Sequence, residues 1–564
     1  MIKKLLPAFL LFAFSFVNAE TIKTDVLVIG GGACGVAAAM QSARSKVKTL
    51  LVEPGPWLGG SMTMGGMCVL DANRDLPSGI WGEFRRKVTD YYRPRLGYDT
   101  SKTAILRFEP SVGAEILRKI TDTVKNLTVK MKTPWTNIKK DGSEWEVTIV
   151  ENGENVTVKA KVVVDGTETG EMAAKAGVKF EDGKEEAINW VAILKDFGKN
   201  ADKTTAKPDG YNQAEFAFLK NKDTRQWLRS CRIPNDKFMI HPDGPISGKN
   251  HDELIKTARL RTLGLVYYLQ KELGYKNIGL DDEFGTPDHL APVPLIEGSR
   301  PVETDIRMVM DDITRPYDRE SKLYRTSIGV GSGVNIPAFS IPLGAIVPKE
   351  TDNLLVAEKA VSVTTEVNRS TMNPAVQMTL GQGVGATAAY CAFFKTTTKH
   401  LTVRIIQGEI LDFKGYLTPF TDVSQNDPHW RAIQQIGATG MLKGIPKKEG
   451  SEVAINFEPN DTVRTAEVKP IFNEIYTRAF LWFNNQKPGE YITLGNLLYF
   501  ISDYTLTDPA TLEPQVRRAW KTQLHLPGEL DVKRPATRLE FAMLVNKYLN
   551  PFGKRVDLTG KVVN

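Results

Sequence analysis

The sequence predicts an α/β protein with a discontinuous parallel-sheet domain, an inserted α+β domain and a small, mostly helical C-terminal domain. An apolar run, a glycine-rich turn, a helical stretch and a second apolar run follow one another within residues 24–60. A further strand pattern occurs at residues 353–357, and the composition changes after residue 400. Strands that alternate with helices are typical of parallel sheets, so both segments are expected in one sheet.

A strand and a glycine-rich turn open this sheet. Residues 25–29 are apolar and lead directly into Gly30-x-Gly32-x-x-Gly35, which an alanine-rich helical stretch follows. The first glycine permits the tight turn, the second lets a diphosphate approach the backbone, and the third allows close helix packing. The diphosphate is favoured at the helix N-terminus, and Glu53, which ends the next strand, is placed to accept a ribose hydroxyl. This order predicts a Rossmann unit that binds a dinucleotide.

The first 19 residues predict a secretory signal peptide. They combine an N-terminal positive charge, an apolar core at residues 5–17 and a small-residue end at Ala19, so cleavage is expected before Glu20. The mature chain would then be soluble, without a membrane span, and periplasmic or at the cell surface. The alternative is an apolar N-terminal helix of the domain itself. Because an exchanging nicotinamide pool is not expected outside the cytoplasm, a tightly held flavin is the favoured dinucleotide.

Four further stretches extend the pattern along the chain. They are the Gly59-Gly60 pair after Glu53, residues 162–177 (VVVDGTETGEMAAKAG), residues 295–301 (LIEGSRP) and residues 341–357. In this order they resemble the FAD-dependent oxidoreductase family of glutathione-reductase-like flavoproteins. The resemblance covers about residues 24–395 and implies FAD as the cofactor. Glu358-Lys359 departs from it, because the family has Gly-Arg at that place.

The expected FAD contacts fall on these same stretches. The Rossmann pattern and the resemblance together assign Gly30, Gly32, Gly35, Glu53, Gly59, Gly60, Ser61, Asp165, Thr167, Asn373, Gly381, Gln382 and Gly385. Residues 380–385 (LGQGVG) are expected to open a helix whose N-terminus faces the flavin pyrimidine, where negative charge develops on reduction.

Four residues are candidates for the chemistry. The flavin performs the redox step itself, so the protein supplies placement, charge and a proton route. Arg300 and Arg369 stay charged and can bind an anionic group or stabilise reduced flavin. His289 is a candidate general base, and Asp71 could orient a substrate hydroxyl. The alternatives are a structural salt bridge for the arginines and plain solvent exposure for the two loop residues.

The expected domains follow from these stretches. After the signal peptide at residues 1–19, residues 20–180 and 341–398 form the FAD-binding domain, and residues 181–340 form a substrate-side insert. Residues 402–564 contain one stretch that resembles an S-layer-homology repeat and part of a second. That resemblance implies contact with a cell-wall or surface polymer; a structural or oligomerising role is the alternative. We also expect the protein without the residues after about 402 to stay soluble, yellow and active.

Composition excludes several other classes of protein. A net charge of +7 over 564 residues, with no long run of like charges, gives nucleic-acid binding little support. The four cysteines are scattered, so the ligand spacing of an iron–sulfur cluster or a structural zinc site is absent and no metal is expected. Hydrolysis by a Ser-His-Asp triad lacks its GxSxG turn.

The sequence therefore predicts an exported FAD-dependent oxidoreductase. It would transfer hydride from a small organic or carbohydrate-like substrate to flavin N5 and pass electrons to an unknown acceptor. One alternative is a flavin-dependent dehydrogenase or ene-reductase acting on a C–C bond beside a carboxylate. Another is a non-catalytic cell-surface binding protein with structural FAD.

Overall fold

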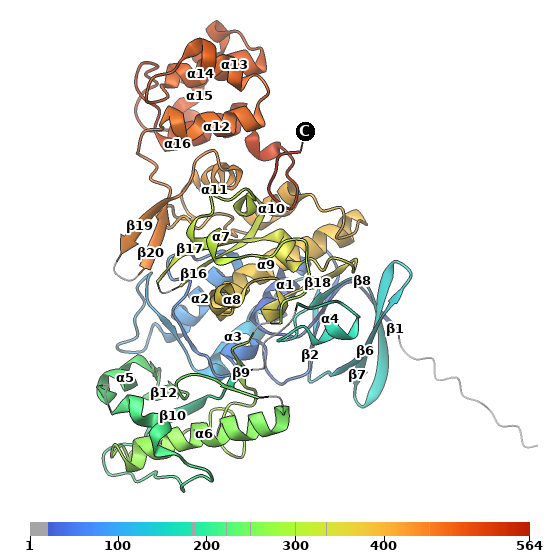
Figure 1. Cartoon of the computed structure of the whole chain (residues 1–564), viewed down its shortest axis with the longest axis vertical. Coiled ribbons are helices and arrows are strands. Elements are labelled where there is room, and N and C mark those ends of the chain that lie inside the picture. Colours follow the sequence, from blue (N-terminus) through green and yellow to red (C-terminus); the bar gives the residue numbers. More distant parts are fainter. Residues whose placement is uncertain are drawn as a thin grey trace, which may run out of the picture.

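The structure, a computed structural model, describes residues 21–181, 187–220, 223–248, 250–298, 300–333, 335–449 and 452–563. The molecule is elongated, with the insert at one end, the main sheet in the middle and a group of helices at the other end (Figure 1). The predicted signal peptide lies outside the described residues. Within the described part of the chain, no helix is both long and apolar enough to cross a membrane.

A seven-stranded sheet forms the centre of the molecule. Its strands run in the order β5 (Leu127–Met131), β2 (Thr49–Glu53), β1 (Thr21–Ile29), β8 (Glu154–Asp165), β7 (Glu144–Glu151) and β6 (Trp135–Asp141), and β18 (Leu354–Val356) also pairs with β8. β1 pairs in parallel with β2 and β8, and β18 pairs in parallel with β8. Residues 26–29 are fully buried because both faces of this strand are covered. The sheet confirms the predicted α/β class.

The direction in which the chain crosses the sheet reverses between β1 and β8. From β1 the chain moves to β2 and β5 on one side, whereas β8 and β18 continue the sheet on the other. Ligands of open α/β sheets bind in the crevice outside the carboxyl ends of the strands at such a point. Ile29, Glu53 and Asp165 end their strands at this edge. The glycine turn that follows β1 therefore lies at the expected ligand crevice.

Two helices pack closely on one face of the sheet. They are α1 (Ala33–Arg44) and α9 (Pro374–Phe394), which contact each other along their length. A Cβ atom on Gly381 or Gly385 of α9 would lie 2.2 or 2.3 Å from a carbonyl oxygen of α1. These glycines thus allow the two backbones to approach, and the predicted helix start near residue 380 is wrong.

α9 extends beyond the beginning of α1. Gly381 lies against Cys34 near the start of α1, so residues 374–380 form roughly 10 Å of helix past that point. Gln382 is buried, and its side-chain amide donates to the side chain of Gln41 at 3.1 Å and to the carbonyl of Phe413 at 3.2 Å. Both helix N-termini point toward the same crevice, and Gln382 serves the contact between helices.

The remaining helices of this part pack on the sheet, on α9 or on strands outside the sheet. They are α2 (Gly79–Tyr92), α3 (Pro110–Asp122), α4 (Glu171–Lys175), α7 (Met310–Thr314) and α8 (Thr365–Thr371). A two-stranded ribbon of β3 (Val69–Leu70) and β4 (Leu106–Arg107) follows the glycine-rich segment. It places Asp71 directly after β3.

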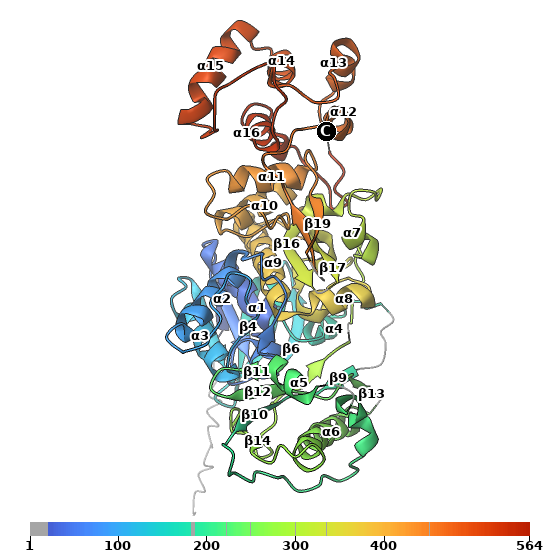
Figure 2. The same ribbon diagram turned by 90° about the vertical axis from the view of Figure 1, so that its left-hand side faces the viewer.

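The insert forms one end of the molecule (Figure 2). Two small antiparallel sheets contain the strands β9 (Ala187–Asn189), β10 (Ala192–Asp196), β11 (Arg232–Ile233), β12 (Lys237–Ile240), β13 (Ile246–Ser247), β14 (Ile278–Leu280) and β15 (Leu295–Ile296). The helices are α5 (Thr224–Ser230) and α6 (His251–Lys271), and α6 buries Leu254, Leu265 and Leu269. This mixture agrees with the α+β character predicted for the insert.

A hairpin that the sequence placed in the insert packs on α9 in the central part of the molecule instead. β16 (Ser327–Gly333) and β17 (Ile336–Pro342) form the hairpin, and β17 pairs in parallel with β20 (Glu452–Asn456), the neighbour of β19 (Ile445–Glu449). The predicted boundary at residue 340 therefore cuts through a strand that joins the C-terminal region to the rest.

The C-terminal region is mostly helical, as predicted. Its helices are α10 (Val403–Asp412), α11 (Trp430–Thr439), α12 (Thr465–Ile475), α13 (Ala479–Gln486), α14 (Leu494–Thr505), α15 (Pro509–Thr522) and α16 (Arg538–Tyr548). α10 packs on α9, and the buried guanidinium of Arg404 donates to the carbonyl of Arg325 at 3.2 Å. Gln407 donates to the carbonyls of Arg325 and Ser327, each at 2.9 Å. This packing argues against a tail that separates near residue 402.

Candidate functional site

The glycine turn joins β1 to α1 and is tightly closed. Gly30 has φ +97°, and a Cβ atom there would lie 2.2 Å from the carbonyl oxygen of Gly166. A Cβ atom on Gly35 would lie 2.0 Å from the carbonyl oxygen of Gly30. Glycine is required at both positions, because the turn brings β1, α1 and the end of β8 into backbone contact.

Glu53 ends β2 beside this turn. Its carboxylate accepts hydrogen bonds from the backbone N–H groups of Gly31 at 2.6 Å and Gly55 at 2.5 Å. Burial raises the pKa of Glu53, and these two N–H groups act in the opposite direction. The N–H of Gly59 donates to the carbonyl of Gly31 at 2.7 Å, which lays the Gly59-Gly60 segment against the turn.

A second carboxylate, that of Glu358, lies at the N-terminus of α1. It accepts the backbone N–H of Cys34 at 2.8 Å and that of Gly35 at 3.4 Å. A Cβ atom on Gly32 would lie 2.3 Å from its oxygen. Burial raises the pKa of Glu358 to about 8, and the neighbouring charge of Glu168 adds to the rise. The carboxylate takes the position at which a helix N-terminus binds an anion.

Sequence reasoning did not place Glu358 in the site. The one available signal was that Glu358 departs from the Gly-Arg that the family resemblance implies at residues 358–359. Glycine would leave the N–H groups of α1 open, whereas glutamate supplies a hydrogen-bond acceptor from within the chain.

Three of the predicted FAD contacts bond within the protein. Asp165 is fully buried, and its carboxylate accepts the N–H and the hydroxyl of Thr167 and the N–H of Ala173 at 2.5–3.0 Å. Burial raises the pKa of Asp165 to about 6. The carbonyl of Ser61 accepts the N–H of Met67 at 2.9 Å. The Asp165 side chain thus shapes the turn after β8, and no free oxygen is left for a ligand.

The N-terminus of α9 forms the other end of the crevice. Asn373 caps the helix by accepting the N–H of Ala375 at 3.0 Å, and its amide group donates to the carboxylate of Asp71 at 3.4 Å. Asn73 is buried behind this pair, with φ +50°, and donates to the carbonyl of Val330 at 3.2 Å. The side-chain oxygen of Asn73 is buried without a partner among the described residues. Polar groups therefore converge where the flavin ring is expected.

The candidate catalytic residues do not form one cluster. The guanidinium of Arg300 lies 4.2 Å from the ring centre of Phe180 and is exposed. His289, with φ +59°, lies 3.2 Å from the carboxylate of Asp282 in the insert. Arg369 is exposed on α8. Among the described residues, no hydrogen bond or ion pair joins any two of the four candidates, and their roles stay predictions.

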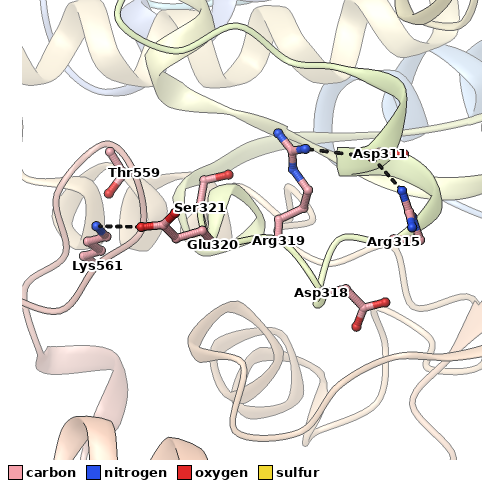
Figure 3. A pocket seen from close by; sticks show the side chains of 8 residues that line it. All are labelled: Asp311, Arg315, Asp318, Arg319, Glu320, Ser321, Thr559 and Lys561. Carbon is pink, nitrogen blue, oxygen red and sulfur yellow. Dashed lines mark hydrogen bonds and ion pairs between the residues drawn. The ribbon is translucent and has the colours of Figure 1, made fainter.

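A charged cleft of about 620 Å³ lies away from the crevice, between α7 and the C-terminal residues (Figure 3). Its side chains pair with one another: Arg315 with Asp311 at 2.7 Å, and Lys561 with Glu320 at 3.8 Å. The pairing neutralises most of its charge, so this cleft offers no distinct chemistry.

A larger groove of about 1070 Å³ runs beside β4 and β11. Its charged lining consists of Arg74, Arg95, Arg107, Arg229 and Arg232 with Asp99 and Asp236. Arg74 also lines a small cavity that contains Asp71, so the groove reaches the polar end of the crevice. The excess of arginine favours an anionic ligand, which guanidinium groups bind through paired hydrogen bonds.

Comparison with known proteins decides the family. Residues 25–410 match the family described as FAD dependent oxidoreductase. The chain belongs to this family. It is an FAD-dependent oxidoreductase, and FAD is its cofactor. No curated protein matches the chain significantly.

Several solved structures match this oxidoreductase at low identity and low TM-score. A p-nitrophenol 4-monooxygenase from Pseudomonas putida DLL-E4 is 12% identical over 74% of this chain and 92% of its own, with a TM-score of 0.35. A geranylgeranyl bacteriochlorophyll reductase-like protein from Thermoplasma acidophilum is 11% identical over 83% of this chain and 100% of its own, with a TM-score of 0.36. A flavoprotein/dehydrogenase from Cytophaga hutchinsonii is 13% identical over 74% and 92%, with a TM-score of 0.35.

The residues of the crevice fit FAD, except that the side chain of Glu358 occupies part of the expected diphosphate site. The closed turn, the buried Glu53 and the two helix N-termini supply donors and acceptors for a diphosphate, a ribose and a flavin ring. FAD supplies the acceptance of hydride or electrons when it is bound. The side chain of Glu358 occupies N–H groups at the start of α1 that would otherwise be available to the diphosphate.

Proposed function

We propose that this FAD-dependent oxidoreductase oxidises a hydroxyl-bearing small organic or carbohydrate-like substrate outside the cytoplasm. The observation that supports this is the pair of Asp71 and Asn373 at the N-terminus of α9, joined at 3.4 Å and open to solvent. The exposed carboxylate of Asp71 accepts the proton of the substrate hydroxyl, and the carbon that bears this hydroxyl gives its hydride to bound FAD. Asn373, fixed by its capping bond to Ala375, orients the carboxylate. The product is a carbonyl compound, and an unknown acceptor takes the electrons.

The test is an anaerobic screen of sugars, polyols and hydroxy acids. A substrate should bleach the visible absorbance of the bound flavin, and Asp71→Asn should slow the bleaching by about 100-fold or more without loss of FAD. If no hydroxyl compound bleaches the flavin, the proposal fails.

A second candidate reaction takes place at a C–C bond beside a carboxylate. The arginines of the large groove favour it, because they would bind the carboxylate of such a substrate. The same screen distinguishes the two reactions when saturated and unsaturated carboxylic acids are added to it. Bleaching by a carboxylic acid that has no hydroxyl group would favour this reaction.

Export and surface contact are further parts of the proposal. Residues 1–19 support export, and the S-layer-homology-like stretches after residue 402 support contact with a cell-wall polymer. Sedimentation of the purified protein with isolated cell walls would test that contact. A protein that binds cell walls and whose flavin no substrate reduces would be the non-catalytic surface protein.

A further inference from the structure

The backbone holds Glu358 in an unusual conformation that aims its side chain at the glycine turn. Glu358 has φ +49°, in the left-handed region that is costly for a residue with a side chain. The main chain is fixed on both sides, because the N–H of Ala357 donates to the carbonyl of Asp165 at 2.9 Å and that of Lys359 donates to the carbonyl of Glu168 at 3.2 Å. The carboxyl group is therefore placed by the fold.

The N–H groups that Glu358 engages are those that a diphosphate needs. The N–H groups of Cys34 and Gly35, in the first turn of α1, have no partner within the helix. Both donate to the Glu358 oxygen. Gly32 is the residue that lets a diphosphate approach the backbone. A Cβ atom there would lie 2.3 Å from the same Glu358 oxygen. An ionised Glu358 would therefore compete with the FAD diphosphate for the N–H groups of α1 and would repel the negative charge of the diphosphate.

Few charges balance this carboxylate. Lys359 is the neighbouring cation, and its ammonium group is already paired with Glu168 and donates to the carbonyl of Ile296. Glu53 holds the adjacent Gly31, and Cys34 presents a buried thiol from α1. From α9 the uncharged Gln377 donates to the Glu358 carbonyl at 3.4 Å.

The remaining neighbour is also acidic. Asp165 ends β8, its carbonyl accepts the N–H of Ala357, and its carboxylate is hydrogen-bonded within its own turn. The described surroundings thus favour a neutral carboxyl, in agreement with the raised pKa of about 8.

We propose that Glu358 closes the diphosphate site of the FAD-free protein and that FAD binds together with one proton, which this carboxyl takes from solvent. The neutral carboxyl donates its O–H to a phosphate oxygen or rotates aside without repulsion. The ionised carboxylate opposes the diphosphate. The protein then binds FAD more tightly at lower pH, and Glu358 makes cofactor binding sensitive to pH.

The experiment measures FAD binding to the FAD-free full chain. Flavin fluorescence gives the Kd between about pH 6.5 and pH 9, and we expect it to rise about tenfold per pH unit above the titration of Glu358. Calorimetry in two buffers of different ionisation enthalpy counts protons. Uptake should approach one proton per FAD at about pH 9 and fall toward zero at about pH 6.5.

Variants separate Glu358 from other titrating groups. Glu358→Gln cannot ionise, so its Kd should be independent of pH and its proton uptake should vanish. Glu350→Gln, which removes an exposed carboxylate paired with Lys179, is the matched control and should behave like the wild type. The proposal is overturned if Glu358→Gln keeps the pH dependence or fails to bind FAD at low pH. If that variant does not fold, the wild-type proton count decides: no uptake at high pH overturns the proposal. Since no substrate is used, the result is independent of the proposed reaction.

Discussion

Arg325 and Glu474 join the segment that leads into β16 to helix α12 of the C-terminal region through two parallel hydrogen bonds. The Arg325 side chain is fully buried, and its second guanidinium nitrogen lies 2.9 Å from the Glu474 carboxylate. The same guanidinium donates to the carbonyl of Gly560 at 3.2 Å. A buried guanidinium depends on such partners, because removing one leaves an uncompensated charge.

We expect Glu474→Gln to lower the free energy of unfolding by about 2 kcal/mol. This is less than the loss for a fully buried pair, since water reaches the Glu474 side. Denaturant unfolding would measure the change. The control is Glu490→Gln, which breaks the exposed pair with Arg464 and should change the stability by less than about 0.5 kcal/mol.

Truncation after residue 402 should yield insoluble protein. It removes α10 and β20, exposes the apolar face of α9, and leaves Arg325 without Glu474. Soluble yield and flavin content of the truncated chain, compared with the full chain, would test this. A soluble, yellow truncated protein would show that the core folds alone, as the sequence had led us to expect.

Gly381→Ala should destabilise the protein by about 1–3 kcal/mol, because its Cβ would collide with the carbonyl of Cys34 in the facing helix. Gly408→Ala is the matched control. Gly408 lies inside α10 with open space around it, so alanine there should stabilise the protein by roughly 0.5–1 kcal/mol. Thermal unfolding of the two variants should therefore shift in opposite directions. Equal shifts would contradict the close contact of α1 and α9.

The same contact shows why the sequence predicted the sheet and missed the helix start. The strand, turn and acid of residues 25–53 are neighbours in the chain, and local patterns describe them well. The glycines near residue 381 look like a turn because their partner helix is more than 300 residues away. The true start carried the ordinary signal of Asn373 as a cap followed by Pro374.

Glu358 was missed for a related reason. Its role depends on hydrogen bonds to residues 324 and 323 positions earlier in the chain. A departure from a family pattern marked the position, but only the three-dimensional arrangement shows that the new side chain reaches α1. The separate positions of Arg300 and His289 could not be predicted either, because they also depend on contacts between residues far apart in the chain.

Arg300→Met should lower turnover by about 100-fold and leave the FAD content unchanged. The guanidinium lies on Phe180, makes no ion pair with the described residues, and remains free to bind a substrate anion. Steady-state kinetics with the substrate found by the anaerobic screen would measure kcat and KM. Arg315→Met, in the remote charged cleft, should leave both values unchanged. A change in KM alone would mean that Arg300 only binds substrate, and full activity would remove it from the site.

The FAD-free protein should lose stability as pH rises from about 5 to about 8. Burial raises the pKa of Glu358 to about 8 from an ordinary value of 4.5, so between these values the folded state holds a proton that the unfolded state has lost. Unfolding releases that proton, and the free energy of unfolding therefore falls with increasing pH. Asp165, with its pKa raised to about 6, adds to the fall only at the acidic end. Denaturant midpoints of the FAD-free protein at about pH 6, 7 and 8 would show the slope, which Glu358→Gln should flatten and Glu350→Gln should leave unchanged. An equal slope in Glu358→Gln would mean that this carboxyl is already ionised in the folded protein.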